Sequence, residues 1–215
     1  MSLYVIAVGL SVTMGLMGFI NLAHGVFAMA GGFVLSTLMA RLGMPFPLAL
    51  LKAFGDLGMK DAGIKLIGPG DITTEEELPA MGDVVLGVTT VFHWSAAGDR
   101  PANKAFVAAW KQEYGAGETP NFLSVGSYDG TALIFEMIKQ QKGQLDPERS
   151  MEIAKQWKFA NSPRGPIAID PETRDIIQPE YLREVKKVGG QLANVEIETL
   201  GAAVKDPWKE LQKKK

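Results

Sequence analysis

The sequence predicts two structural classes in one chain: one or two transmembrane helices, followed by an α/β domain with a mostly parallel sheet. The first rests on the lack of any charged side chain from Ser2 to Ala40, a run about twice the roughly 20 residues of one membrane span. The second rests on short apolar runs that alternate with helical patterns after Pro47. Between two strand patterns near the carboxyl end, Gly189-Gly190 predicts a hairpin turn.

Composition and charge exclude several classes of protein. The 215 residues include 22 basic and 24 acidic side chains, for a net charge of −2, without a basic stripe. This balance argues against a nucleic-acid partner. The absence of cysteine excludes disulfides, thiol catalysis and iron–sulfur clusters, and only His24 and His93 are available as imidazole ligands. We therefore expect no metal, no cofactor and no nucleic-acid partner.

Residues 1–50 are predicted to be a transmembrane segment. They contain one charged side chain, Arg41, and many glycines, which let membrane helices approach closely. We expect two spans, over 3–20 and 26–40, separated by a polar break. A secretory signal cleaved near Ala30 is the alternative, because the preceding Ala-Met-Ala has the small-x-small form of a cleavage site. The length of the apolar run, and the lack of a basic residue ahead of it, favour retained helices.

The polar break carries a run of residues with a known counterpart. Residues 18–25 read Gly-Phe-Ile-Asn-Leu-Ala-His-Gly. Within residues 4–32, this run resembles the start of the membrane permease of branched-chain amino-acid ABC transporters. The resemblance covers only one or two helices of such a permease, and it implies a membrane location with permease subunits as partners. His24 is interpreted either as a polar residue at a helix end or as part of a transport pathway.

Strand and helix patterns alternate in residues 51–215. Strands are expected over 64–68, 84–94, 122–126, 167–170, 181–188 and 191–199, and helices over 101–114, 128–141 and 147–157. A short helix ending at Leu78 is expected to be capped by Asp71 or Thr74. The alternating units are few for a complete doubly wound domain, so we expect the sheet to lack partner strands.

Separated motifs in this second part resemble one family. They are Ala-Gly-Ile-Lys-Leu-Ile-Gly-Pro-Gly at 62–70, Pro-Ala-Asn-Lys-Ala-Phe at 101–106, Gly-Ser-Tyr-Asp-Gly at 126–130, Ser-Pro-Arg-Gly-Pro-Ile at 162–167, Ile-Asp-Pro-Glu-Thr-Arg-Asp at 169–175 and Asp-Pro-Trp-Lys at 206–209. In this order they resemble the C-terminal half of an extracytoplasmic solute-binding protein of the leucine-binding-protein type. The resemblance implies a partial type I periplasmic-binding-protein fold over 51–215, with a mostly parallel sheet flanked by helices and a C-terminal β-hairpin. It also implies a chimera of two parts of one transport system, joined near residues 50–52.

No residue pattern indicates an enzyme, so no catalytic residue is assigned. The sequence lacks a G-x-x-x-x-G-K-[ST] phosphate loop and a G-x-S-x-G nucleophile elbow. His93, Ser127 and Asp129 have the residue types of a catalytic triad, but no spacing supports one. The acids at 75–77 are interpreted as the solvated first turn of a helix, where they complement the helix dipole.

Asp71 is the first of four candidate ligand-binding residues. In open α/β sheets, ligands bind beyond the carboxyl ends of strands, and Asp71 follows a predicted strand. The resemblance implies an ammonium-binding acid in this loop, and Asp71 is the nearest acid. In the family this acid usually follows a Gly-Pro pair directly, whereas Gly70 stands at that place here. The alternative role of Asp71 is a helix N-cap.

The other three candidates are aromatic residues or a histidine. His93 and Trp94 lie where the resemblance implies that the chain crosses between two lobes. Their rings are expected either to line the ligand pocket or to pack at the hinge. Tyr128 opens a helix after a predicted strand and is expected to face the cleft. The resemblance further implies that donors for a ligand carboxylate come from the missing first half, so the site is expected to be incomplete.

These observations predict a component or fragment of an ABC uptake system for branched-chain amino acids, amides or small carboxylates. The expected location is the inner membrane with a periplasmic domain. One alternative is a soluble periplasmic binding module, released by cleavage near Ala30. Another is a structural or interaction protein that dimerises through its exposed sheet. Residues 52–215 alone are expected to be marginally stable, because an incomplete sheet exposes apolar surface and an unpaired edge.

Overall fold

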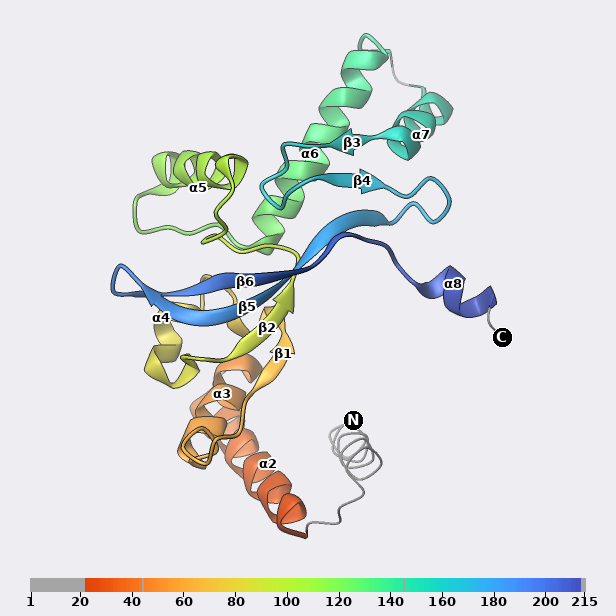
Figure 1. Cartoon of the computed structure of the whole chain (residues 1–215). Coiled ribbons are helices and arrows are strands. Elements are labelled where there is room, and N and C mark those ends of the chain that lie inside the picture. The colour runs from red at the N-terminus through yellow and green to blue at the C-terminus, as the bar shows by residue number, and fades with distance from the viewer. Residues whose placement is uncertain (1–21, 44, 145, 214–215) are drawn as a thin grey trace. The chain divides into compact units, whose positions relative to one another are not determined.

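The computed structural model describes residues 22–43, 45–144 and 146–213 (Figure 1). The chain divides into two compact units, Met1–Ile64 and Lys65–Lys215. The domain boundary that the sequence predicts, near residue 50, falls inside the first unit. The first predicted membrane span, residues 3–20, lies outside the described residues.

In the described part of the first unit, two helices contact each other, α2 (Leu22–Leu42) and α3 (Phe46–Asp56). Residues 26–40, predicted as a second membrane span, are helical and lie within α2. Gly43 follows α2 with a φ of 63°, a backbone conformation in which glycine commonly ends a helix. Pro47 stands in the first turn of α3, where its fixed φ suits the helix. Among the described residues, no helix has both the length and the apolar character that crossing a membrane requires.

The second unit is built on a six-stranded mixed sheet. Its strands are β1 (Ile67–Pro69), β2 (Thr89–Phe92), β3 (Lys158–Phe159), β4 (Ile167–Ile169), β5 (Ile176–Val188) and β6 (Gln191–Val204). The strand order is β1-β2-β5-β4-β3, and β6 pairs with β5 outside that path. β1 and β2 are parallel, and the other described pairs are antiparallel. The prediction of a mostly parallel sheet is therefore wrong. After β2 the chain forms three helices and two short strands, and the next strand to pair with β2 is β5, which runs antiparallel to it.

Helices and short 3-10 turns connect these strands. They are η1 (Gly70–Thr73), α4 (Leu78–Met81) and η2 (Gly82–Val85) between β1 and β2, α5 (Pro101–Tyr114), α6 (Phe122–Gln140) and α7 (Pro147–Gln156) between β2 and β3, and α8 (Trp208–Lys213) after β6. In Figure 1, α5, α6 and α7 lie with β3 and β4 on one side of the β5–β6 pair, and α4 lies with β1 on the other. The helices predicted at 101–114 and 147–157 are confirmed.

Two predicted strands are corrected by the structure. Residues 122–126 form the first turn of α6, because Asn121 Oδ1 accepts a hydrogen bond from the backbone N of Ser124 at 2.9 Å and completes a capping box. Periodicity alone does not separate such a short apolar run from the start of a helix. The strand predicted over 84–94 is shorter, since residues 82–85 form η2 and Gly87 has a φ of 82°.

β5 connects the two ends of the sheet. Its first residues pair with β4, residues 181–184 pair with β2, and most of its length pairs with β6. Tyr181, Arg183 and Val185 alternate along it as buried residues. The predicted C-terminal hairpin is confirmed, and Gly189 and Gly190, with φ values of 59° and 84°, form its turn. Because β5 pairs with β4, β2 and β6 along its length, its inward side chains form one continuous core in the second unit.

The capping box of α6 predicts a measurable contribution to stability. Asn121→Ala removes the acceptor for the Ser124 amide, so we expect the free energy of unfolding to fall by about 1 kcal/mol. Urea denaturation of the full chain measures this change. The control, Asn121→Ser, keeps a capping oxygen and is expected to lose clearly less. An equal loss in both variants would show that the cap does not stabilise α6.

Candidate functional site

The carboxyl ends of the two parallel strands lie at the same edge of the sheet. Pro69 of β1 is level with Val91 of β2, so the residues that follow them emerge together. The approach is close: a Cβ atom on Gly70 would lie 2.2 Å from Cγ of Phe92, so glycine is required there. Asp71 lies at this edge on η1 and is exposed. It does not cap α4, which begins after Glu77 without a side-chain cap, so the predicted N-cap role is wrong.

Three rings lie together at this edge of the sheet: Phe92, His93 and Phe122, which we call the edge cluster. The ring centroids are 4.4 Å apart for Phe92 and His93, and 5.1 Å apart for Phe92 and Phe122. His93 and Phe122 are separated by 6.3 Å. Phe122 is the first residue of α6, so the helix start brings the third ring to the strands. All three side chains are half-buried and leave part of an aromatic surface open.

His93 is neutral at physiological pH. Burial, followed by the nearby charges of Arg164 and Arg183, lowers its pKa to about 4. The neutral imidazole offers one donor and one acceptor nitrogen. Each of these guanidinium groups also has a buried carboxylate partner, Glu75 for Arg183 and Asp129 for Arg164.

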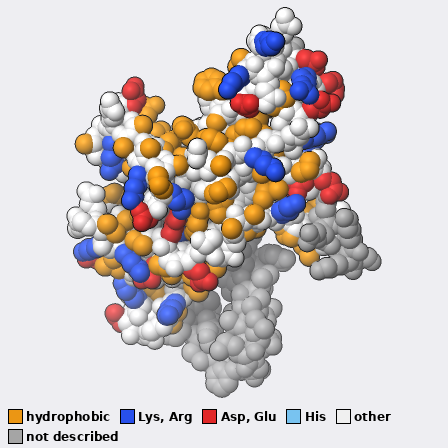
Figure 2. All heavy atoms as spheres, turned by 45° about the horizontal axis from the view of Figure 1, so that its top comes forward, with side chains coloured by type: hydrophobic (Ala, Val, Ile, Leu, Met, Phe, Trp, Pro, Cys, Tyr) orange, Lys and Arg blue, Asp and Glu red, His pale blue; other side chains and the backbone are white. Residues whose placement is uncertain are grey.

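Trp94 and Tyr128 belong to a second group of rings. Trp94 is fully buried, and its Nε1 donates a hydrogen bond to Asn103 Oδ1 at 2.7 Å. Its ring lies 6.4 Å from that of Phe106 on α5, and Phe106 lies 5.1 Å from Tyr128 on α6. Tyr128 is 47% exposed. Figure 2 shows hydrophobic side chains gathered in the hollow between the projections that α5 and α6–α7 form. Trp94 therefore supports the fold beneath the surface, whereas Tyr128 presents its ring at the surface.

Arg183, a residue that the sequence reasoning missed, holds the edge of the sheet together. Its side chain is fully buried on β5. One Nη donates to the carbonyl of Trp94 at 2.7 Å, and the other donates to the carbonyl of Gly70 at 3.0 Å. The guanidinium also donates to Thr90 Oγ1 and lies 4.9 Å from the ring centre of Phe92. Its position between Tyr181 and Val185 in the alternating pattern is the sequence signal that marks an inward-facing arginine.

Glu75 balances the charge of Arg183. Its carboxylate lies 3.6 Å from Nη1 of Arg183 and accepts a hydrogen bond from Asn194 Nδ2 at 3.0 Å. Burial raises the pKa of Glu75, while the arginine and the asparagine oppose that rise. The interpretation of residues 75–77 as a solvated helix turn is therefore wrong for Glu75, although Glu76 is exposed.

A second buried pair fastens α6 to the turn before β4. Arg164 Nε donates to Asp129 Oδ2 at 2.7 Å, and Ser162 Oγ donates to the same oxygen at 2.9 Å. Tyr181 on β5 donates to the carbonyl of Arg164 at 2.7 Å. Burial raises the pKa of Asp129, and its other oxygen has no hydrogen-bond partner among the described residues. This network orients the helix that carries Phe122 and Tyr128.

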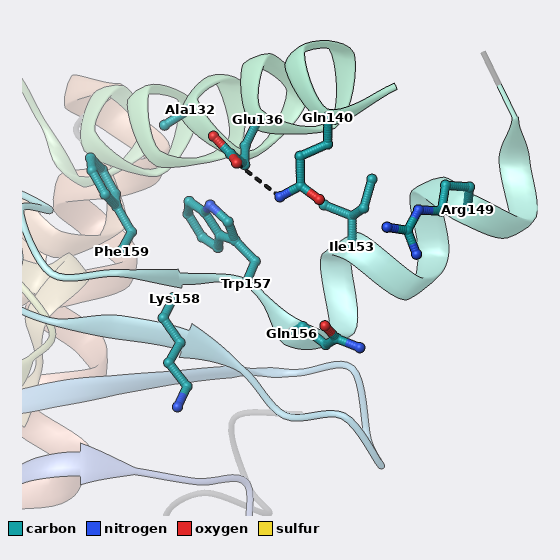
Figure 3. A pocket seen from close by; sticks show the side chains of 9 residues that line it. All are labelled: Ala132, Glu136, Gln140, Arg149, Ile153, Gln156, Trp157, Lys158 and Phe159. Carbon is teal, nitrogen blue, oxygen red and sulfur yellow. Dashed lines mark hydrogen bonds between the residues drawn. The ribbon is translucent and has the colours of Figure 1, made fainter. Parts of the chain in front are cut away.

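One cavity of about 530 Å³ lies between α6, α7 and β3 (Figure 3). It is lined by Ala132, Glu136, Gln140, Arg149, Ile153, Gln156, Trp157, Lys158 and Phe159. It contains none of the four predicted site residues. Two of its charges have partners, since Gln140 donates to Glu136 at 2.8 Å and Arg149 pairs with Glu152 at 3.1 Å. The edge cluster, not this cavity, combines open aromatic surface with a neutral imidazole.

Comparison with known proteins gives a family match and two sets of relatives. A sequence model of the family described as periplasmic binding protein matches residues 35–191. The chain is 44% identical over 156 residues to the Leu/Ile/Val-binding protein homolog 6 of Brucella suis biovar 1, and 43% identical to that of Brucella abortus. These alignments cover 72% of this chain and 40% of each relative, so the chain spans about two-fifths of their length.

Solved structures give the same picture of partial coverage. The solute-binding protein of an ABC transporter from Rhodopseudomonas palustris BisB5, determined with 3,4-dihydroxybenzoic acid, is 47% identical with a TM-score of 0.70. The match covers 76% of this chain and 44% of that chain. Another solute-binding protein from R. palustris, determined with 4-hydroxybenzoate, is 41% identical with a TM-score of 0.69, and the match covers 77% and 44%.

The buried arginine predicts a large loss of stability when it is removed. Arg183→Met leaves Glu75 buried without its cation, and we expect the free energy of unfolding to fall by about 3–5 kcal/mol. Urea denaturation of the full chain provides the value. Arg149→Met is the matched control, because its pair with Glu152 is exposed and is expected to contribute no more than about 1 kcal/mol. Similar losses in the two variants would contradict a special role for Arg183.

The neutral histidine predicts a loss of stability in acid. The folded-state pKa of about 4 lies below the ordinary value of 6.5, so the unfolded chain binds the proton more readily. Stability is complete above pH 6.5 and declines as the pH falls from 6.5 towards 4. Between pH 7 and pH 5 we expect the contribution of His93 to fall by about 1–2 kcal/mol. Urea denaturation at both pH values should show a smaller decline for His93→Phe, and an unchanged decline would refute the assignment.

Proposed function

Because the chain belongs to the periplasmic binding protein family, we propose that Lys65–Lys215 forms the solute-binding part of a receptor for an ABC uptake system. The similarity to solute-binding proteins of ABC transporters at 41–47% identity supports this function. Its partners are then a small solute and the permease subunits that accept it. A receptor needs a shaped surface and not a reactive group, and the edge cluster is such a surface.

An aromatic carboxylate is the solute class that the site supports best. The observation that carries this proposal is the edge cluster, in which a neutral His93 lies beside Phe92 and Phe122, near the charges of Arg164 and Arg183. Aromatic rings offer an apolar surface to a benzoate ring, a neutral imidazole can bond a ring hydroxyl, and the nearby guanidinium groups attract the carboxylate. The similar R. palustris receptors were determined with hydroxylated benzoic acids.

A branched-chain amino acid is the second candidate. It has the support of the Brucella relatives, which are named Leu/Ile/Val-binding protein homologs. An α-amino acid also needs an acid for its ammonium group, and Asp71 is the acid at the edge of the sheet. Either solute would contact the rings of the edge cluster, but only the amino acid would also need Asp71 as the partner of its ammonium group.

The location of the receptor follows from the same proposal. A solute-binding part of this family acts in the periplasm, where it meets the outer face of its permease. If residues 1–50 are permease-like membrane helices, as their resemblance implies, they would anchor the receptor part at the inner membrane as a fusion. This membrane anchor and the homodimer stay predictions.

Competition between two solutes tests the proposed function. We expect saturation-transfer NMR of the full chain to show binding of 4-hydroxybenzoate but not of leucine. His93→Ala is expected to weaken 4-hydroxybenzoate binding by about tenfold, because one aromatic contact and one hydrogen bond are lost. Asp71→Asn is the matched control and should leave this binding unchanged. Stronger binding of leucine, abolished by Asp71→Asn, would overturn the aromatic proposal in favour of the amino acid.

A further inference from the structure

The cavity between α6, α7 and β3 has no part in the proposed function. Its volume of about 530 Å³ falls within the roughly 300–1,000 Å³ that is typical of small-molecule sites. Its apolar wall is buried, since Ile153 is 5% exposed and Trp157 is 9% exposed. Phe159, two residues after Trp157, adds a second ring, and the two ring centroids are 5.6 Å apart. The cavity therefore offers an aromatic wall that the fold holds in place.

Polar groups of the same cavity have unused hydrogen-bonding capacity. Figure 3 shows the indole of Trp157 below Glu136 and Gln140 of α6, whereas Lys158 points away from these side chains. Gln140 donates to one oxygen of Glu136 at 2.8 Å, which leaves the other carboxylate oxygen to accept. Among the described residues, neither the indole N–H of Trp157 nor the side-chain amide of Gln156 has a hydrogen-bond partner. Unpaired donors and acceptors thus lie beside the aromatic wall.

The charges at the cavity do not favour an ion. Arg149 on α7 pairs with Glu152 at 3.1 Å, and both side chains are more than half exposed. Lys158 points away from α6, and Glu136 adds a carboxylate to the lining. Exposed charges of both signs attract neither an anion nor a cation strongly. The ligand that suits this lining is neutral, apolar on one face, and able to donate and accept hydrogen bonds at its edge.

We propose that the cavity between α6, α7 and β3 binds a neutral sugar in its pyranose form. The C–H face of a pyranose ring is apolar and packs on the rings of Trp157 and Phe159. Each hydroxyl group both donates and accepts, so the sugar pairs with the indole N–H of Trp157, the amide of Gln156 and the free oxygen of Glu136. This site is independent of the proposed function, because no residue of the edge cluster lines the cavity.

Saturation-transfer NMR of the full chain, in a detergent without a sugar head group, tests this site. The probes are D-glucose, D-galactose, D-mannose and D-xylose, each measured separately. We expect at least one of them to bind with a dissociation constant in the millimolar range, because a ligand of this size makes few contacts. Gln156→Ala is expected to weaken that binding by about 5- to 10-fold, since one neutral hydrogen bond is lost. Gln156 is exposed, so the urea denaturation curve should be unchanged.

Trp157→Leu removes part of the aromatic wall and should weaken the same binding by at least about tenfold. Gln191→Ala is the comparison variant, because Gln191 at the start of β6 is an exposed glutamine that does not line the cavity. It should bind the sugar as the unchanged chain does. Failure of every probe to bind, or binding that either cavity variant leaves unchanged, would overturn the proposal.

A mixture of solutes separates this site from the edge cluster. An excess of 4-hydroxybenzoate should leave saturation transfer to the sugar unchanged. Displacement of the sugar would overturn the proposal, because the sugar would then lie at the edge cluster. A chain that binds a sugar but not 4-hydroxybenzoate would contradict the proposed function alone. The reverse result would contradict the sugar site alone.

Discussion

The buried guanidinium of Arg183 is the interaction on which the second unit depends. Isolated charges are costly to bury, and this one is retained because its donors reach the carbonyls of Gly70 and Trp94 and the hydroxyl of Thr90, with Glu75 as the counter-ion. The two carbonyls belong to the chain segments that follow β1 and β2. One side chain on β5 therefore sets the distance between the two segments that carry Asp71 and His93. Thr73, Glu75 and Asn194 extend this network from η1 to β6.

β5 also connects the Arg183 network to α6 and to the turn before β4. Tyr181 on the same strand donates to the carbonyl of Arg164, whose guanidinium holds Asp129 on α6. Arg100 packs over the ring of Tyr181 and forms a two-point pair with Glu196 on β6. The strand thus joins two arginine networks through Tyr181 and Arg183, which are two residues apart near its middle, and both networks reach segments that hold aromatic rings. The start of α6 and the end of β2 are aligned by the same set of buried charges.

The chemical character of the edge cluster is a consequence of these charges. The guanidinium groups of Arg164 and Arg183 already bond to carboxylates and carbonyls of the protein, so neither is free to form a full ion pair with a solute. Burial, and after it the nearby charges of these two arginines, lowers the pKa of His93 and keeps its imidazole neutral. The edge cluster therefore offers a solute aromatic rings and a neutral imidazole, beside two guanidinium groups that already have protein partners.

The sequence by itself determined the family and the elements whose signals are local. The Gly189-Gly190 turn, the proline-started helices α5 and α7, and the position of Asp71 after a strand all follow from turn chemistry and short-range periodicity. Only the tertiary structure decided the direction of the strands and the burial of Glu75. These depend on partners distant in the chain: β5 for β2, and Arg183 for Glu75. The helical state of residues 122–126 rests instead on a local signal that periodicity missed, the Asn121 capping box. The local sequence pattern does not identify which distant residue pairs with a buried charged side chain, because strand pairing brings the two residues together only in the folded chain.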